Sequence, residues 1–358
     1  MRIWPFKNER NRANSFIRMK FMINKLPTRR HFLNYAKFYF LFLLSSCSSD
    51  SKKITIGFQN SFVPNSFKDI LPNWWIKEDI KFNNINLKSN MQKYKKSDLI
   101  LISDGWINNI DFDDFKNHNL SLINRLDEKS QKYLITYDSS KREKLFPIGV
   151  IPYVLIIKNN KNLKIDNNTS WNFLLSKDLK GKIILPNSPR ILISIARKIN
   201  TQNSIKKILS QVNIYDDKNA IDWLINTDSV IALMPYSQCH RYLKIDTRLS
   251  LVFPNEGVPL LWNFILIKSN SNISETNFYQ WIKSLEDINI FERLKNEGWY
   301  LPFNKGFIQF ENIIEKGKYS KLIKNPSKEC WDNSWSYPPL NLYEKKELEK
   351  WWNELSSP

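Results

Sequence analysis

The chain has 358 residues, enough for two domains or for one large α/β domain, because a domain commonly holds ~150 residues. Its 22 Phe, 14 Tyr and 13 Trp exclude a disordered chain, and its three Cys exclude a disulfide scaffold and a cysteine-cluster zinc domain. Three scattered His residues argue against a histidine-based metal site, and the eight Gly form no phosphate-binding loop motif, so we expect no bound metal and no cofactor.

The net charge of +19 is concentrated near the N-terminus. Residues 1–46 hold ten Lys or Arg against Glu9 alone and carry +9, so the remaining 312 residues carry +10. Lys, Asn and Ile are frequent throughout that remainder, which indicates a coding bias rather than a basic binding face. No arginine-rich helix or RNA-recognition run occurs, so we expect no nucleic-acid partner.

Residues 1–46 have the parts of a signal peptide. Basic residues in 28–34 precede the apolar run 38–44, which is shorter than the ~20 residues that a transmembrane helix needs. The twin-arginine and general-secretion interpretations of the pair at 29–30 both stay open. Small residues then lead to Cys47, in a pattern that resembles a bacterial lipobox. We expect Cys47 to carry a lipid anchor and residues 47–53 to form a tether.

Apolar strands and helices alternate along the rest of the chain. The continuous apolar run after Asp98 indicates a strand buried on both faces of a parallel sheet, and Ser188 with Pro189 is typical of a helix start. Predicted strands cover residues 54–58, 98–103, 146–157, 182–185, 229–234, 249–253 and 260–267. Predicted helices cover residues 67–76, 170–175, 188–198, 216–226, 277–287, 288–296 and 343–355. This alternation predicts an α/β architecture.

Several short stretches have the order and spacing of one protein family. They are Ser97–Leu101, Ser170–Leu174 with Leu179–Ile184, the pair Arg197 and Lys198, Phe253–Gly257, and Gly298–Pro302. Together they resemble the extracytoplasmic solute-binding proteins of ABC transporters, specifically the spermidine/putrescine-binding group. The resemblance covers most of residues 53–320, and it depends on the order of the motifs rather than on any one of them.

The resemblance implies an α/β, two-lobed, periplasmic-binding-protein-like (type II) fold with a ligand cleft between the lobes. Residues 54–147 plus 260–306 would form lobe 1, and residues 148–259 plus 307–358 would form lobe 2. The segments 147–153 and 260–264 would be the hinge strands. Ligand would then lie beyond the carboxyl ends of the strands, as in other open α/β sheets.

The loops at this cleft supply the candidate ligand-binding residues. A polyamine is a flexible polycation, so its site needs carboxylates for the ammonium groups and aromatic rings for the methylenes. Asp104 is the carboxylate that we place there, whereas Arg190 would repel a polycation and would suit an anion. The predicted ligand residues are Ser61, Phe62, Ser103, Asp104, Trp106, Asn187, Arg190, Tyr236, Trp262 and Asn263.

The sequence thus predicts a lipid-anchored receptor on the periplasmic face of a bacterial membrane, which delivers a polyamine to an ABC permease. The same fold binding an anionic small molecule, the same fold binding ferric iron through Tyr153, Tyr236 and Tyr337, and a ligand-free structural lipoprotein stay open as alternatives. No nucleophile motif occurs, so we expect no enzyme. Cys239 and Cys330 form either a disulfide or two buried thiols.

Overall fold

The computed structural model describes residues 54–59, 63–73, 75–80, 97–159, 169–199, 201–216, 218–304, 325–337 and 339–356. The chain divides into two units, residues 1–52 and 53–358, and every described residue belongs to the second. The predicted signal peptide, Cys47, the tether, Ser61 and Phe62 lie outside the described residues.

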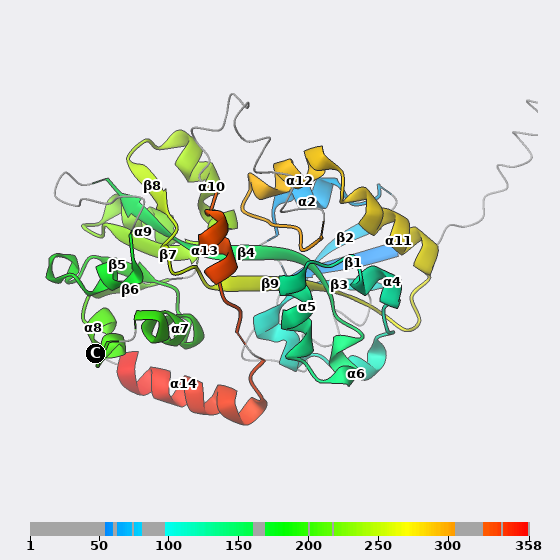
Figure 1. The fold of residues 1–358 in the computed structure, drawn as a ribbon, viewed down its shortest axis with the longest axis horizontal. Coiled ribbons are helices and arrows are strands. Elements are labelled where there is room, and N and C mark those ends of the chain that lie inside the picture. The colour runs from blue at the N-terminus through cyan, green and yellow to red at the C-terminus, as the bar shows by residue number, and fades with distance from the viewer. Residues whose placement is uncertain are drawn as a thin grey trace, which may run out of the picture. The chain divides into compact units, whose positions relative to one another are not determined.

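A mixed sheet of nine strands runs through the described part of the chain (Figure 1). Parallel pairs join β1 to β2 and β3, and join β5 to β6 and β7, whereas β4 and β9 pair only antiparallel with their neighbours. The strands are β1 (Ile54–Gln59), β2 (Trp75–Ile80), β3 (Leu99–Ser103), β4 (Phe146–Lys158), β5 (Ile183–Leu185), β6 (Val212–Tyr215), β7 (Ile231–Pro235), β8 (Leu249–Val252) and β9 (Leu260–Ile267). Their order is β2-β1-β3-β9-β4-β7-β5-β6, with β8 beside β4.

The long strand β4 joins two halves of this sheet. Its residues Phe146–Pro152 pair with β9, and its later residues Tyr153–Lys158 pair with β7 and β8. We call β1, β2, β3 and β9 the first half, and β5 to β8 the second half. The predicted hinge segments 147–153 and 260–264 therefore pair with each other at the point where the halves meet.

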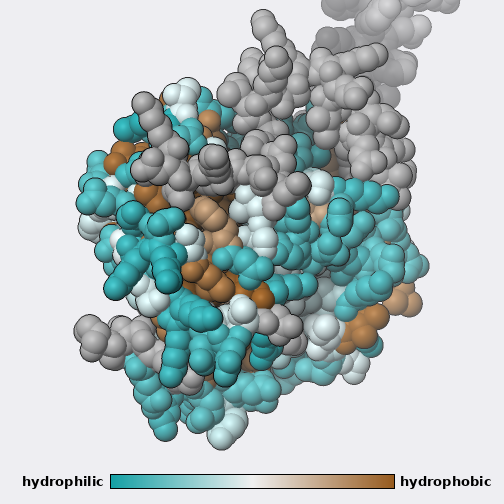
Figure 2. Space-filling view, turned by 60° about the vertical axis from the view of Figure 1, so that its left-hand side comes forward, coloured by the Kyte–Doolittle hydropathy of each residue, from teal (hydrophilic) through white to brown (hydrophobic). Residues whose placement is uncertain are grey.

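Helices pack around both halves (Figure 1). In α7 the buried residues follow one another at intervals of one and three, so one apolar face packs inward. They are Ile191, Leu192, Ile195, Ala196 and Ile199. The face in Figure 2 is accordingly mostly hydrophilic, and its hydrophobic surface gathers near the middle and at the lower right. The helices are α2 (Asn65–Asp69), α4 (Leu120–Ile123), α5 (Glu128–Ile135), α6 (Ser139–Arg142), α7 (Pro189–Ile199), α8 (Ser204–Leu209), α9 (Ala220–Asn226), α10 (Tyr236–Ile245), α11 (Glu275–Ser284), α12 (Ile288–Lys295), α13 (Lys328–Asn333) and α14 (Leu342–Ser356). The 3-10 helices are η1 (Asp104–Asn109), η2 (Phe112–Asp114), η3 (Trp171–Leu175) and η4 (Lys177–Leu179).

The predicted helix 67–76 is wrong beyond its first turn. Helix α2 ends at Asp69, and Trp75 begins β2 by pairing with Ile54. Pro72 lacks a backbone N–H and cannot continue a helix, and its carbonyl accepts a turn bond from Trp75 instead. The apolar spacing suggested one helix because Phe67 of α2 and Trp75 of β2 both pack on the same ring, that of Trp281.

Two other helix predictions need smaller corrections. Residues 171–175 form a 3-10 helix rather than an α-helix. Helix α9 begins at Ala220 rather than at Asp216, because the Asp216 carboxylate accepts backbone N–H bonds from Lys218 and Asn219 and thereby forms a turn. The strand after Asp98 is parallel to β1 but antiparallel to β9, so the sheet is mixed rather than wholly parallel.

The two described cysteines are free and buried. Cys239 lies in α10, and its thiol donates to the carbonyl of Tyr236 at 3.3 Å. Cys330 lies in α13, and its thiol donates to the carbonyl of Pro254 at 3.2 Å. Burial raises the pKa of Cys330 to about 11, so this thiol is protonated at neutral pH. Of the two alternatives from the sequence, the structure has the buried thiols.

His118 lies in an aromatic environment between two rings. The ring centroids of Phe146 and Phe278 lie 5.5 and 5.7 Å from that of His118. The Nε2 atom of His118 lies 3.3 Å from the carbonyl oxygen of Ile265. Burial disfavours the imidazolium and lowers the pKa of His118 to about 4.

This histidine makes stability depend on pH in one direction. A folded-state pKa below the unfolded value of 6.5 means that stability is present near neutral pH and is lost as the pH falls towards 4. We expect a loss of about 2 kcal/mol, because the residue is partly accessible and the full shift does not apply. Burial also lowers the pKa of His240, so His118→Phe should lose stability as well. Urea unfolding between pH 7 and about 4 should show a loss that is larger by about this amount in the native chain than in His118→Phe. An equal loss in both proteins would contradict the assignment.

Candidate functional site

Asp104 follows the last residue of β3 and is buried, with 7% of its surface exposed. The hydroxyl of Tyr133 donates to its carboxylate at 3.0 Å, and backbone N–H groups of Gly105 and Trp262 donate to it as well. Burial raises the pKa of Asp104, while the positive charge of Arg190 opposes that rise. The predicted carboxylate is therefore enclosed by hydrogen-bond donors and by one cation from the second half.

Four aromatic rings, which we call the aromatic group, lie beside this carboxylate. Tyr133 stacks on Trp262 at 4.8 Å and on Phe264 at 6.2 Å, and it meets Tyr137 edge to face at 5.6 Å. Trp262 is 1% exposed and Phe264 is fully buried. Such rings can hold the methylenes of a ligand and can attract a cation to their faces. The aromatic half of the predicted site is thus present around Asp104.

Arg190 enters the site from the first turn of α7. Its guanidinium carbon lies 4.8 Å from the ring centroid of Tyr337, and the Tyr337 hydroxyl lies 2.7 Å from Ser194 Oγ. Burial raises the pKa of Tyr337, so this phenol is neutral at physiological pH. The site therefore holds one acid within electrostatic reach of one arginine, and it is not the acid-rich site that a polycation prefers.

Asn263 lies on the opposite face of the sheet from Trp262. Successive side chains of a strand point to opposite faces, and both Trp262 and Phe264 contact Tyr133. Asn263 is 2% exposed, and its Nδ2 atom has no hydrogen-bond partner within the described part of the chain. The two adjacent residues that the sequence assigned to one site are thus separated by the backbone of β9.

The remaining predicted residues lie around this cluster or away from it. Ser103 is buried and pairs with Asn263 in the β3–β9 ladder. Trp106 and Asn187 each contact α14, as described below. Tyr236 is buried at the start of α10, where it meets Phe253 edge to face at 5.9 Å. Tyr236 and Tyr337, two tyrosines of the ferric alternative, therefore contact different residues.

A cavity of about 330 Å³ reaches both halves without being lined by Asp104 or Trp262. Its lining residues come from the segment that leads into α2, from the turn before α9 and the start of α9, from β7 and from α10. They include Val63, Pro64, Lys218, Asn219, Met234, Ser237, His240 and Arg241. A second cavity of about 310 Å³ lies between His118 and the start of α11. None of the eight predicted ligand residues that the structure describes lines either of these two cavities.

Sequence reasoning missed five side chains of the site. Tyr133 and Tyr137 lie on or beside α5, a helix that was not predicted, although their spacing of four residues is that of one helix face. Ser194 is an unremarkable polar residue of α7. Phe264 lies on β9 two residues after Trp262 and was not assigned to the site. Ser336 reaches the site from 74 positions away from Trp262. Tyr337, which the sequence named for the ferric alternative alone, lies 143 positions from Ser194. No local pattern carries that information.

Solved structures of transporter proteins share this fold. PotD, a spermidine/putrescine ABC transporter substrate-binding protein from Streptococcus pneumoniae, matches with a TM-score of 0.64 and 12% identity, covering 86% of this chain and 100% of that one. The TpPotD lipoprotein of Treponema pallidum matches with a TM-score of 0.58 and 12% identity, covering 84% and 98%. A ferric binding protein from Campylobacter jejuni matches with a TM-score of 0.55 and 13% identity, covering 84% and 99%.

This chain has the fold of ABC transporter substrate-binding proteins. The resemblance stated from the sequence is thereby confirmed at the level of the fold, and so is the mixed α/β architecture. No protein-family model and no curated protein matches the chain. Within the described ranges, no helix has both the length and the apolar character needed to cross a membrane.

Proposed function

We propose that this protein is the lipid-anchored solute receptor of an ABC importer. The observation that carries the proposal is a buried carboxylate, Asp104, set among aromatic rings beside the β4–β9 pair. In this proposal residues 54–147 plus 260–306 form one lobe and residues 148–259 plus 307–358 form the other. The paired segments 147–153 and 260–264 are the hinge, since they connect the two halves of the sheet.

The ligand in this proposal is a polyamine of the spermidine/putrescine class. An ammonium group would pair with Asp104, and Tyr133 and Trp262 would flank the methylenes. Two of the solved structures with this fold carry the PotD name, which supports this class. A second candidate is an anionic small molecule, and the observation in its favour is Arg190 beside the same carboxylate.

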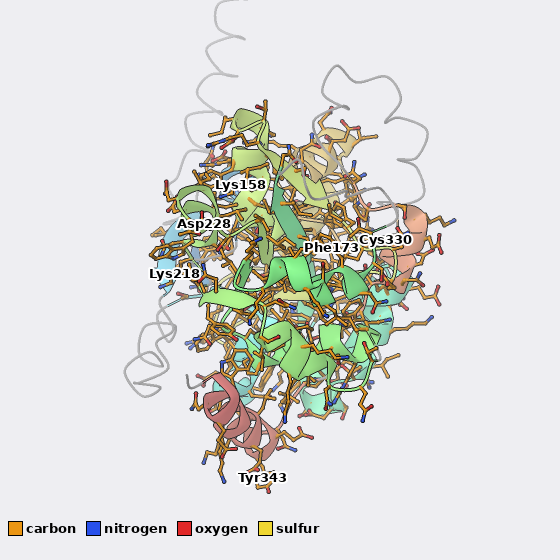
Figure 3. The ribbon with its side chains drawn as sticks, turned by 90° about the vertical axis from the view of Figure 1, so that its left-hand side faces the viewer. Lys158, Phe173, Lys218, Asp228, Cys330 and Tyr343 are labelled. Carbon is orange, nitrogen blue, oxygen red and sulfur yellow. The ribbon has the colours of Figure 1, made fainter. Side chains whose placement is uncertain are left out.

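Thermal unfolding separates the two ligand classes. A ligand that binds only the folded state adds about 2.7 kcal/mol of stability at a concentration 100 times its Kd, which raises the melting temperature by several degrees. We expect spermidine or putrescine to raise it in the native chain and in Asp228→Asn, but not in Asp104→Asn. Asp228 is an exposed acid in the loop between α9 and β7 (Figure 3) and is not a predicted ligand residue, so it is the matched control.

The opposite pattern would favour the anion. Phosphonates or other anions would then shift the native chain and Arg197→Ala, an exposed position on the same helix as Arg190, but not Arg190→Ala. Ferric citrate and amino acids complete the panel. If no solute shifts the native chain, the proposal of a receptor fails, and the ligand-free structural lipoprotein takes its place.

Lipid attachment at Cys47 is the second testable part of the proposal. The thiol of Cys47 follows two small residues and an apolar run, which is the pattern that lipoprotein processing recognises. We expect radioactive palmitate to label the native precursor in a bacterial host and to leave Cys47→Ala unlabelled. Cys239→Ala is the control, because that cysteine is buried in α10. Equal labelling of the native protein and Cys47→Ala would contradict lipid attachment at Cys47.

A further inference from the structure

A segment near the C-terminus, residues 334–337 and 339–341, connects α13 to α14 and is called the strap below. Its start lies beside β9. The N–H of Leu260 donates to the carbonyl of Trp335 at 2.9 Å, and the N–H of Trp335 donates to the carbonyl of Val258 at 3.1 Å. The strap therefore pairs beside the start of β9, the strand that carries Trp262 and Phe264 of the aromatic group.

Side chains of the strap contact predicted ligand residues directly. The indole Nε1 of Trp262 donates to Ser336 Oγ at 2.6 Å. Tyr337 is 7% exposed, and its ring lies 4.8 Å from the guanidinium carbon of Arg190 while its hydroxyl meets Ser194 Oγ at 2.7 Å. Trp262 is a ring of the proposed polyamine site, and Arg190 is the cation whose charge acts on Asp104.

The strap also binds the first half of the fold. The side-chain amide of Asn108, in η1, donates to the carbonyl of Leu340. The ammonium of Lys129, in α5, donates to the carbonyl of Ser334 at 2.8 Å. Figure 1 shows the chain running from α13, between the α7 side and the α5 side, towards α14. The strap is thus attached to elements on both sides of the site.

Helix α14 extends this cover over two more predicted residues. The Nζ atom of Lys345 lies 5.9 Å from the ring centroid of Trp106. The indole Nε1 of Trp352 donates to Asn187 Oδ1 at 2.9 Å. Together, the strap and α14 contact four of the eight predicted ligand residues that the structure describes.

The strap is chemically suited to lie against these groups. Residues 334–341 contain no charged side chain, so the strap adds no charge to the region of Asp104 and Arg190. Their hydroxyl groups complete hydrogen bonds with Trp262 and Ser194 inside a buried region, where an unmade bond would be costly. The neutral ring of Tyr337 covers the apolar surface of Arg190.

We infer that the strap is the protein's own occupant of the proposed ligand site, and that strap and solute exclude each other. The inference rests on the proposed function, because it names what the solute must displace. A site that is open for only a fraction of the time binds its ligand more weakly by that fraction. The strap therefore sets the affinity of the receptor, and α13 and α14 are the anchors from which it can swing.

Calorimetric titration of the full chain with spermidine tests the competition. We expect Tyr337→Ala to bind spermidine at least tenfold more tightly than the native chain, since it removes the covering ring. Ser336→Ala, a milder change that loses the bond to Trp262, should give a smaller gain. The matched control is Tyr343→Ala, since Tyr343 is 73% exposed and projects from α14 away from the rest of the ribbon (Figure 3). Unchanged or weaker binding by Tyr337→Ala would overturn the inference.

Hydrogen exchange of the ligand-free proteins provides a test that needs no solute. Without Tyr337 the strap should release β9 and α7, so peptides covering Leu260–Ile267 and Pro189–Ile199 should exchange faster in Tyr337→Ala than in Tyr343→Ala. Equal exchange in both variants would contradict the inference that the strap covers the site. Faster exchange in Tyr337→Ala without any spermidine binding would instead support the strap and contradict the proposal that the ligand is a polyamine. Spermidine added to the native chain should speed exchange of residues 334–341, and slower exchange there would also contradict displacement.

Discussion

Replacing Trp262 by alanine is expected to lower the free energy of unfolding by about 3–5 kcal/mol, the cost of deleting a large buried ring. The indole is 1% exposed, stacks on Tyr133 at 4.8 Å and donates a hydrogen bond to Ser336. Its removal leaves a cavity between β9 and α5 and an unpaired hydroxyl on the strap. Chemical denaturation of the native chain and of Trp262→Ala measures the difference.

Trp223→Ala is the matched control for this prediction. Trp223 is 41% exposed, and its indole donates to the surface carboxylate of Asp216 at 2.9 Å. Solvent already reaches this ring, so its removal should cost only ~1 kcal/mol. A similar loss for both variants would mean that Trp262 does not pack as the structure has it. A loss confined to Trp262 would support its place at the centre of the site.

Gly257→Ala should destabilise the protein by about 3 kcal/mol through backbone strain and overpacking together. Gly257 has φ of +89°, a conformation that an alanine adopts only with strain. A Cβ atom there would lie 2.4 Å from the backbone of Asn333, at the end of α13 just before the strap. The backbone cannot rotate out of the way, so α13 has to move from the β8–β9 turn.

Gly181→Ala separates strain from crowding. Gly181 has φ of +67°, but an added Cβ would meet nothing within 4 Å. It should therefore cost only the ~1 kcal/mol of a left-handed alanine. Equal losses at the two glycines, measured by urea unfolding, would contradict the tight contact between the turn and α13. The Gly257 variant should also loosen the strap and so speed hydrogen exchange at residues 334–341.

Local patterns in the sequence determined most of the sheet. The run Phe146–Ile157 is apolar throughout, and it is a strand because a continuous apolar segment of this kind is buried on both faces. Asp104 was placed correctly at the end of a strand, since the turn follows the apolar residues directly. The order of such elements sufficed for the resemblance to solute-binding proteins, and the structural matches confirm that fold.

Other elements could not be read locally because competing structures have the same spacing. The aromatic residues between 67 and 75 fit a helix face, yet Trp75 joins β1 in a parallel pair once Pro72 ends the helix. Helix α5, which carries Tyr133, has low apolar content and was not predicted. Periodicity reports the side of an element that is buried, but it does not report the partner on which that side packs.

By itself, then, the sequence determined the α/β alternation, the strand that joins the two halves and the position of Asp104, because each depends on neighbours within a few residues. Only the tertiary structure decided that the face of β9 with Trp262 packs on Tyr133 and that Arg190 lies close enough to influence Asp104. The tertiary structure alone brought Tyr337 into contact with Ser194 of α7, which lies 143 positions earlier in the chain. Such contacts depend on how distant segments of the chain pack against each other. The local pattern allows many such arrangements, and the burial of rings and of charge selects one of them.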